Sequence, residues 1–152
     1  MPLRFYPNLS VFFILLFIVI AGCGYGGEDL SEWEEEHGFG PITEPVQIGE
    51  LDVHLASEGL NLFLSLCSDC HAVEGQIIGP ALRPSVDRRS PEFLMNYIIN
   101  PAENRERHPV GHELAEHYPA HMIDLSITEE EARALYEFLR YYNENRENPP
   151  LN

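Results

Sequence analysis

A Cys-x-x-Cys-His motif is the part of this sequence best suited to chemistry. The stretch LCSDCHAVEG, from Leu66 to Gly75, contains Cys67, Cys70 and His71. Two thiols and an imidazole at this spacing could form a disulfide, half of a zinc site, a redox dithiol or the attachment point of a haem. The rest of the chain narrows these four possibilities.

Cysteine count excludes a zinc site made of cysteines alone, and the local context argues against a redox dithiol. The only other cysteine is Cys23, so a structural zinc site built from cysteines alone lacks ligands. A thioredoxin-like dithiol follows a strand and opens a helix, whereas here a helical pattern precedes the motif. Covalent haem gives every residue a role, because Cys67 and Cys70 form thioethers and His71 becomes an axial ligand of the iron. A disulfide or redox pair remains the alternative.

The second axial position of such an iron has several candidate ligands. Met122 lies in a polar segment before the last helical pattern, and its soft thioether would raise the potential of a haem iron. Met95 lies inside a helical pattern, where core filling is the expected role. His117 and His121 could reach the iron from the same segment as Met122 and would lower the potential. We expect Met122, with His117 or His121 as the alternative.

Four histidines between residues 108 and 121 have spacings that could indicate a second metal site. Pro109 and Pro119 interrupt the pairs that are four residues apart, so a shared helical face is not expected. We expect these side chains to be solvated loop histidines, at positions 108, 112, 117 and 121.

Three helical patterns would position the motif. The first leads from Val53 directly into Cys67. The second is RSPEFLMNYIINP, capped by Ser90, and the third is SITEEEARALYEFLRYY, which opens on a capping box of Thr128 and Glu131. The motif is therefore expected at the C-terminal end of a helix.

No long run alternates apolar and polar residues, so the fold class is expected to be all-α. We expect three to five short helices, with 72–89 and 101–127 as long loops. A domain of this kind has little core of its own, and a large apolar cofactor would supply the missing core.

The first residues have the pattern of an export signal. Arg4 precedes twelve apolar or small residues, VFFILLFIVIAG, which reach only about 18 Å and are too short to span a bilayer core of about 30 Å. The residues before Cys23 resemble a bacterial lipobox, in which this cysteine is lipidated. We therefore expect a lipoprotein signal peptide over 1–22 and a lipid anchor on Cys23; an ordinary signal peptide is the alternative.

The mature chain is expected to have three parts. Residues 23–52 are rich in glycine, proline and acid and predict a lipidated N-terminal tether with a solvated Trp33. Residues 53–143 form the folded domain, and 144–152 form a flexible tail. The whole chain has nine Lys plus Arg, 25 Asp plus Glu and a net charge of −16, so it lacks the basic patch that nucleic-acid binding requires.

The folded part, from about Val53 to Tyr142, resembles a class I, monohaem bacterial cytochrome c. The similarity rests on Gly59-x-x-x-Phe63 before the motif, on GPAL after it, and on YPAHM followed by LSITEEEARALYEFLR. It implies the small cytochrome c fold wrapped around one covalently bound haem c. It also implies that Gly59 meets Phe138 where the first and last helices cross.

The resemblance extends to the surroundings of the histidine and to function. It implies that the Pro80 carbonyl accepts a hydrogen bond from His71 Nδ1. It further implies an electron carrier rather than an enzyme, passing single electrons between respiratory components on the periplasmic side of the cell envelope, lipid-anchored to the inner or outer membrane.

The expected partners are redox proteins such as a quinol-oxidising complex, a terminal oxidase or a periplasmic reductase. A dedicated donor subunit for a terminal reductase or oxidase, for example nitrous oxide reductase, is an alternative, and a haem ligand sensor is another. The acidic charge favours a basic surface on the partner.

Overall fold

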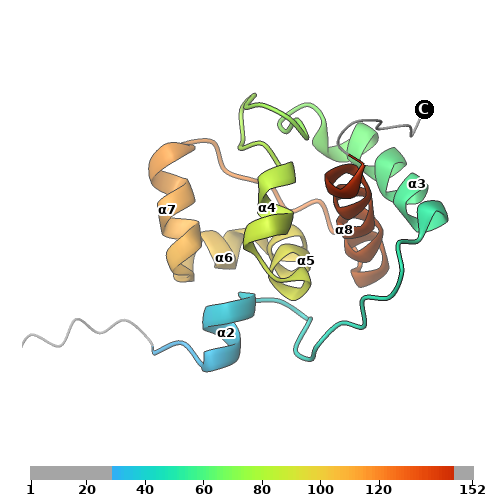
Figure 1. The fold of residues 1–152 in the computed structure, drawn as a ribbon. Coiled ribbons are helices and arrows are strands. Elements are labelled where there is room, and N and C mark those ends of the chain that lie inside the picture. The colour runs from blue at the N-terminus through green and yellow to red at the C-terminus, as the bar shows by residue number, and fades with distance from the viewer. Residues whose placement is uncertain (1–28, 146–152) are drawn as a thin grey trace, which may run out of the picture.

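The computed structural model describes residues 29–145, and these residues are helical with no strand (Figure 1). The all-α prediction is confirmed. Seven α-helices and one π-helical segment follow one another in this order: α2 (Glu32–His37), α3 (Val53–Leu62), η2 (Phe63–Cys67), α4 (Arg83–Arg88), α5 (Pro91–Ile99), α6 (Pro101–Arg107), α7 (Pro109–His117) and α8 (Glu129–Glu144). None of the described helices is long and apolar enough to cross a membrane.

The predicted loops 72–89 and 101–127 are wrong in part, because α4, α6 and α7 lie within them. In the sequence, Pro101 is the last residue of the second helical pattern, where it is expected to end the helix, and Pro109 is expected to interrupt a shared helical face. In the structure each of these prolines is the first residue of a new helix. Proline suits that position, since its missing N–H would have no partner in the first turn.

The first and last helices of the domain cross in close contact. A Cβ atom added at Gly59 of α3 would lie 2.0 Å from the Ala134 carbonyl oxygen and 2.9 Å from Phe138 Cβ. The rings of Phe63 and Phe138 pack beside this point with centroids 5.2 Å apart. The predicted meeting of Gly59 and Phe138 is confirmed, and only a residue without a side chain permits this approach.

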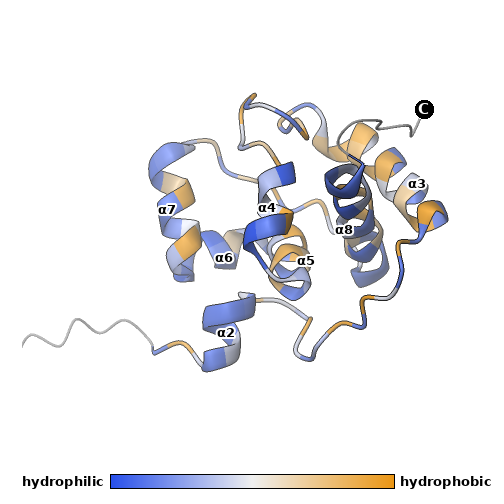
Figure 2. Cartoon of the chain, viewed as in Figure 1, coloured by the Kyte–Doolittle hydropathy of each residue, from blue (hydrophilic) through white to orange (hydrophobic). Residues whose placement is uncertain are grey.

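The hydrophobic core lies between α8, α5 and the end of α3. Leu135, Phe138 and Leu139 of α8 are buried together with Phe93 and Met95 of α5. Most of the visible face of α8 is polar in Figure 2, as expected of a helix that buries only one side. Met95 is 3% exposed, so its predicted role as core filling is confirmed.

The N-terminal segment departs most from expectation. Residues 31–48, called here the N-terminal strap, pack against α5, α6 and His108, the N-cap residue of α7, instead of forming a solvated tether. Phe39 and Ile42 are buried. Trp33 is half-buried and its Nε1–H donates to the Ile42 carbonyl oxygen at 3.2 Å. The predicted tether is therefore wrong over these residues.

Buried polar side chains explain why the strap docks with so little apolar surface. Asn96 of α5 and Asn104 of α6 are fully buried. Asn96 accepts a hydrogen bond from the Ile42 N–H at 3.0 Å and donates to the Ile42 carbonyl at 3.0 Å. Glu92 accepts a hydrogen bond from the Val46 N–H at 2.7 Å. These side chains thus supply hydrogen bonds to the backbone of the strap, which would otherwise have to come from water.

Candidate haem site

The motif occupies the end of the first helix, as predicted. Helix α3 continues into η2, where the Ser68 N–H bonds to the Phe63 carbonyl at 2.9 Å across five residues. The chain then turns tightly, because the N–H groups of Cys70 and His71 both bond to the Cys67 carbonyl, at 3.1 Å and 2.9 Å. This turn keeps the two thiols and the imidazole within one short segment whose backbone is held by hydrogen bonds.

The two thiols are free in the structure. Cys67 is half-buried and Cys70 is exposed, so the disulfide alternative is not formed. Burial raises the pKa of the Cys67 thiol, and the neighbouring Cys70 raises it further. A redox dithiol instead needs a thiol whose pKa is lowered, since the thiolate is the reactive form. The local electrostatics do not favour a redox pair.

His71 is held by two contacts on its far side. Its Nδ1 lies 3.0 Å from the Pro80 carbonyl oxygen, which confirms the predicted hydrogen bond. A Cβ at Gly79 would lie 2.4 Å from His71 Cε1, so the ring rests directly against the glycine backbone. The Gly79 N–H in turn bonds to the Cys70 carbonyl at 2.8 Å. Gly79 was not among the expected site residues, although it is the first residue of the GPAL stretch.

These residues fit a covalently attached haem. Once the Nδ1–H is given to Pro80, the remaining lone pair on His71 Nε2 is available to a metal. Leu66, Ile77 and Ile78 flank the motif and are 41%, 53% and 50% exposed. Side chains of this kind are usually buried, and here they are available to cover an apolar macrocycle.

Met122 lies on a separate segment, between α7 and α8. It is half-buried and does not belong to the partly buried hydrophobic side chains that pack on the core. The segment is held at both ends: Arg105 Nη1 donates to the Tyr118 carbonyl at 3.4 Å, and Ile127 is buried. The structure thus brings Cys70, His71 and Pro80 together in one loop and places Met122 on a different part of the chain.

The prediction of solvated loop histidines is wrong for His108, which is buried, and wrong in part for His112 and His117, which are exposed but lie in α7. His108 is 2% exposed and caps α7 by accepting from the Val110 N–H at 3.1 Å. His112, His117 and His121 are exposed, and His117 Nδ1 bonds to the carbonyl of Glu113 at 2.9 Å. Over residues 29–145 no three or more His, Cys, Asp or Glu side chains form a group that could hold a metal ion.

Comparison with known proteins agrees with a haem site at this motif. The family model described as "Cytochrome c" matches residues 56–143. A search of curated proteins finds no match.

Solved structures match a larger part of the chain. Cytochrome c from Rhodothermus marinus is 39% identical with a TM-score of 0.70, and the match covers 76% of this chain and 99% of that one. An engineered cytochrome c from the same organism, Rma TDE, is also 39% identical, with a TM-score of 0.69 and coverage of 74% and 97%.

Proposed function

Because this chain belongs to the cytochrome c family and is therefore an electron carrier with one covalently bound haem c, we propose that Cys67 and Cys70 hold the haem and that His71 and Met122 are its axial ligands. The observation that carries this proposal is the free Cys67–Cys70 pair beside a His71 ring whose Nδ1 already has a partner. When bound, the haem supplies a one-electron iron couple.

The protein's own residues orient and insulate this couple. The Pro80 carbonyl fixes the tautomer of His71, and the Gly79 backbone fixes the plane of its ring. No side chain takes or gives a proton in the transfer of a single electron, so no residue is catalytic. A rigid ligand set serves such a carrier, because little rearrangement is then needed between the oxidised and reduced forms.

Met122 is proposed as the second ligand because its thioether has no role in the core. A methionine ligand raises the potential of a haem iron, whereas a second histidine would lower it. His117 bonds to its own helix and His121 is exposed, so neither histidine is prepositioned by a buried partner.

A potentiometric titration with optical spectra in both redox states tests this ligand set. We expect a high potential and the thioether-to-iron charge-transfer band in the wild type. Met122→Ala should abolish the band, while Met95→Leu, a change in the core, should keep it. A low potential without the band in the wild type would contradict Met122 and favour His117 or His121. A stable open or weakly held axial site in the wild type would favour the ligand-sensor alternative.

We further propose that a lipid on Cys23 anchors the protein to a membrane outside the cytoplasm, where bacterial cytochromes c typically act. Cys23 and the predicted signal peptide 1–22 lie outside the described residues, as does the predicted tail beyond residue 145. Since the strap begins at Ser31 with a capping box, only residues 24–30 separate the lipid from the domain. Seven residues span at most about 25 Å when fully extended, so the domain would stay close to the membrane surface.

The short connection favours a partner bound to the same membrane. Tethering raises the effective concentration of such a partner, and a quinol-oxidising complex or terminal oxidase fits this arrangement. The quinol-oxidising complex would be the electron donor and the terminal oxidase the acceptor; a periplasmic reductase, such as nitrous oxide reductase, is the second candidate for the acceptor.

Mass spectrometry of the membrane fraction tests the anchor. It should find a diacylated Cys23 as the first residue, and Cys23→Ser should release a soluble haem protein. An unmodified cysteine in a soluble fraction would support the ordinary signal peptide instead.

A further inference from the structure

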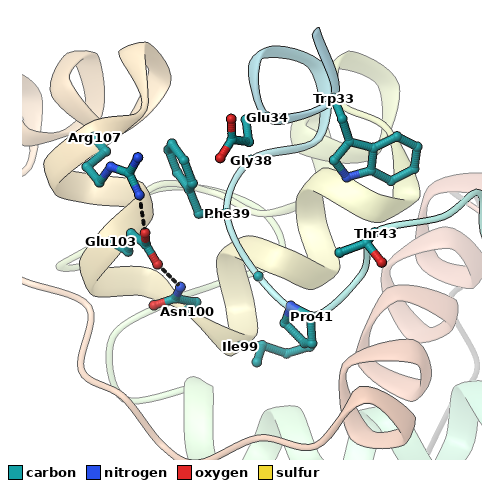
Figure 3. Close-up of a pocket in the computed structure, with 11 residues that line it drawn as sticks. Trp33, Glu34, Gly38, Phe39, Pro41, Thr43, Ile99, Asn100, Glu103 and Arg107 are labelled. Carbon is teal, nitrogen blue, oxygen red and sulfur yellow. Dashed lines mark hydrogen bonds and ion pairs between the residues drawn. The ribbon is translucent and has the colours of Figure 1, made fainter. Parts of the chain in front are cut away.

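The N-terminal strap contacts α6 through a fully buried amide. Asn104 accepts a hydrogen bond from the Phe39 N–H at 2.8 Å and donates to the Phe39 carbonyl at 2.6 Å. The pairing leaves no Asn104 atom without a partner. Figure 3 shows Phe39 beside Arg107, whose guanidinium lies 4.2 Å from the ring centroid, with Arg107 also joined to Glu103. The strap and α6 are thus held by polar bonds and by a cation–π contact.

His108 joins the same strap to α7. The ring is buried, with Nε2 lying 3.1 Å from the Glu35 carbonyl and Nδ1 accepting from the Val110 N–H at 3.1 Å. The Nε2–H therefore donates to α2 while Nδ1 caps α7. One imidazole ties the backbone of α2 to the first turn of the helix that leads to Met122.

Helices α6 and α7 pack directly against each other. A Cβ at Gly111 of α7 would lie 2.0 Å from the Asn104 carbonyl oxygen, so the two backbones are in direct contact. Arg105 of α6 then donates to the Tyr118 carbonyl at 3.4 Å, at the point where the Met122 segment begins. A continuous set of contacts therefore runs from the strap, through α6 and α7, to a residue four positions before Met122.

We propose that the N-terminal strap is a positioning element for the axial methionine: by fixing α6 and α7 through Asn104 and His108, it limits how far the Met122 segment can swing open. This inference rests on the proposed ligation by Met122. The strap would thereby suppress exchange of the thioether for external ligands, which keeps the protein a carrier. Asn104, His108 and Arg105 are positioning residues and do not touch the iron.

Two full-length variants separate the strap contact from other effects. In His108→Asn, the shorter amide can still cap α7 but cannot reach the Glu35 carbonyl. Asn104→Leu keeps the volume of the side chain and removes its bonds to Phe39. The rate of imidazole binding to the ferric protein, at saturating imidazole, measures how often the Met122 segment opens. Amide hydrogen exchange at Phe39 and Ile42 reports release of the strap in the same samples.

We expect both variants to expose these amides and to raise the limiting rate of imidazole binding about tenfold, since each leaves buried backbone groups unpaired. The matched control is Asp52→Ala, which removes the N-cap of α3, where Asp52 accepts from the His54 and Leu55 N–H groups. This control should lower stability while leaving the limiting rate near that of the wild type.

Three results would overturn the inference. The first is protected strap amides in both variants. The second is a limiting rate in the variants no higher than in Asp52→Ala, despite release of the strap; both of these leave ligation by Met122 intact. The third is a wild-type protein without the thioether charge-transfer band, which removes the ligand assignment itself.

Discussion

Gly59 and Gly79 each lie where another part of the chain comes too close to leave room for a side chain. A Cβ at Gly59 would overlap the backbone of Ala134, and a Cβ at Gly79 would overlap the ring of His71. The first contact is between helices and the second is between a loop and a candidate ligand. Replacing either glycine by alanine should therefore have a different measurable effect.

Gly59→Ala should lower the free energy of unfolding by about 2 kcal/mol, because the strain of overpacking exceeds the gain in helix propensity. The cost arises at a backbone carbonyl only 2.0 Å from the added atom, which cannot rotate away. Chemical denaturation followed by circular dichroism measures the change. Gly49→Ala is the matched control, since a Cβ there meets nothing within 4 Å; equal effects of the two changes would contradict the helix-crossing argument.

Gly79→Ala should displace the His71 imidazole while leaving helix content unchanged. The added atom would lie 2.4 Å from Cε1, well inside van der Waals contact, so the ring must shift or tilt. We expect a changed midpoint potential and a larger high-spin fraction in the optical spectrum. A spectrum identical to that of Gly49→Ala would show that Gly79 does not position the ligand.

At the scale of secondary-structure elements, buried hydrogen bonds attach segments to the domain that a larger hydrophobic core would hold in a bigger protein. The strap is bound by Asn96, Asn104 and Glu92, and the buried Glu137 of α8 accepts from the Asp52 N–H at 2.9 Å. Each of these side chains binds the backbone of a segment that has no apolar stripe of its own. The loss of any one of these side chains would therefore leave a buried backbone group without a partner.

His108 should make the stability of the strap and α7 depend on pH. Its pKa lies below the ordinary value of 6.5, chiefly because burial disfavours the charged ring, and the Glu35 carbonyl opposes this shift only in part. Between the two values the unfolded chain binds a proton that the folded chain does not, so stability falls as pH drops below about 6.5.

Urea unfolding at about pH 7.5 and about pH 5 measures this dependence. The wild type should lose more stability across this interval than His108→Asn, because the variant has no group at position 108 that titrates there. An equal loss in the two proteins would contradict a buried neutral His108. The comparison is made as a difference because His37, Glu92, Arg89 and His112 also face this region.

The whole molecule is dominated by its negative charge. The net charge is −16 and no lysine is present, so long-range attraction should favour cationic redox partners. The acidic first turns of α2 and α8 contribute to this field from different parts of the molecule. In Figure 1, α2 and the segment that follows α3 lie at opposite ends of the domain. The lipid anchor that we propose on Cys23 would attach at the α2 end and would therefore leave the Cys67–His71 end away from the membrane.

Salt should affect electron transfer with opposite sign for cationic and anionic small oxidants. The rate at which tris(1,10-phenanthroline)cobalt(III), a cation, oxidises the reduced protein should fall several-fold as ionic strength rises from about 0.01 M to about 0.5 M, because screening removes the attraction. The rate with ferricyanide should rise over the same interval. Stopped-flow measurements give both rates, and salt responses of the same sign would refute steering by the net charge.

Local sequence determined the motif, its helix and its caps. The turn at Cys67–His71, the capping box at Thr128 and Glu131, and the buried role of Met95 all depend on residues within one or two helical turns, so spacing alone could predict them. The contacts of Gly59 with Phe138 and of His71 with Pro80 were available only through resemblance to a family, and the structure confirms both.

Only the tertiary structure decided the fate of residues 31–48 and of His108. The strap's composition predicts a solvated tether, because its apolar content cannot support a core. Its partners, Asn96 and Asn104, lie 54 and 65 positions away from Ile42 and Phe39, and no periodicity connects them. The amide of an asparagine can supply the hydrogen bonds that a paired strand would otherwise give to a backbone segment, but only after folding has brought the two together. This proximity is a property of the fold rather than of the local sequence.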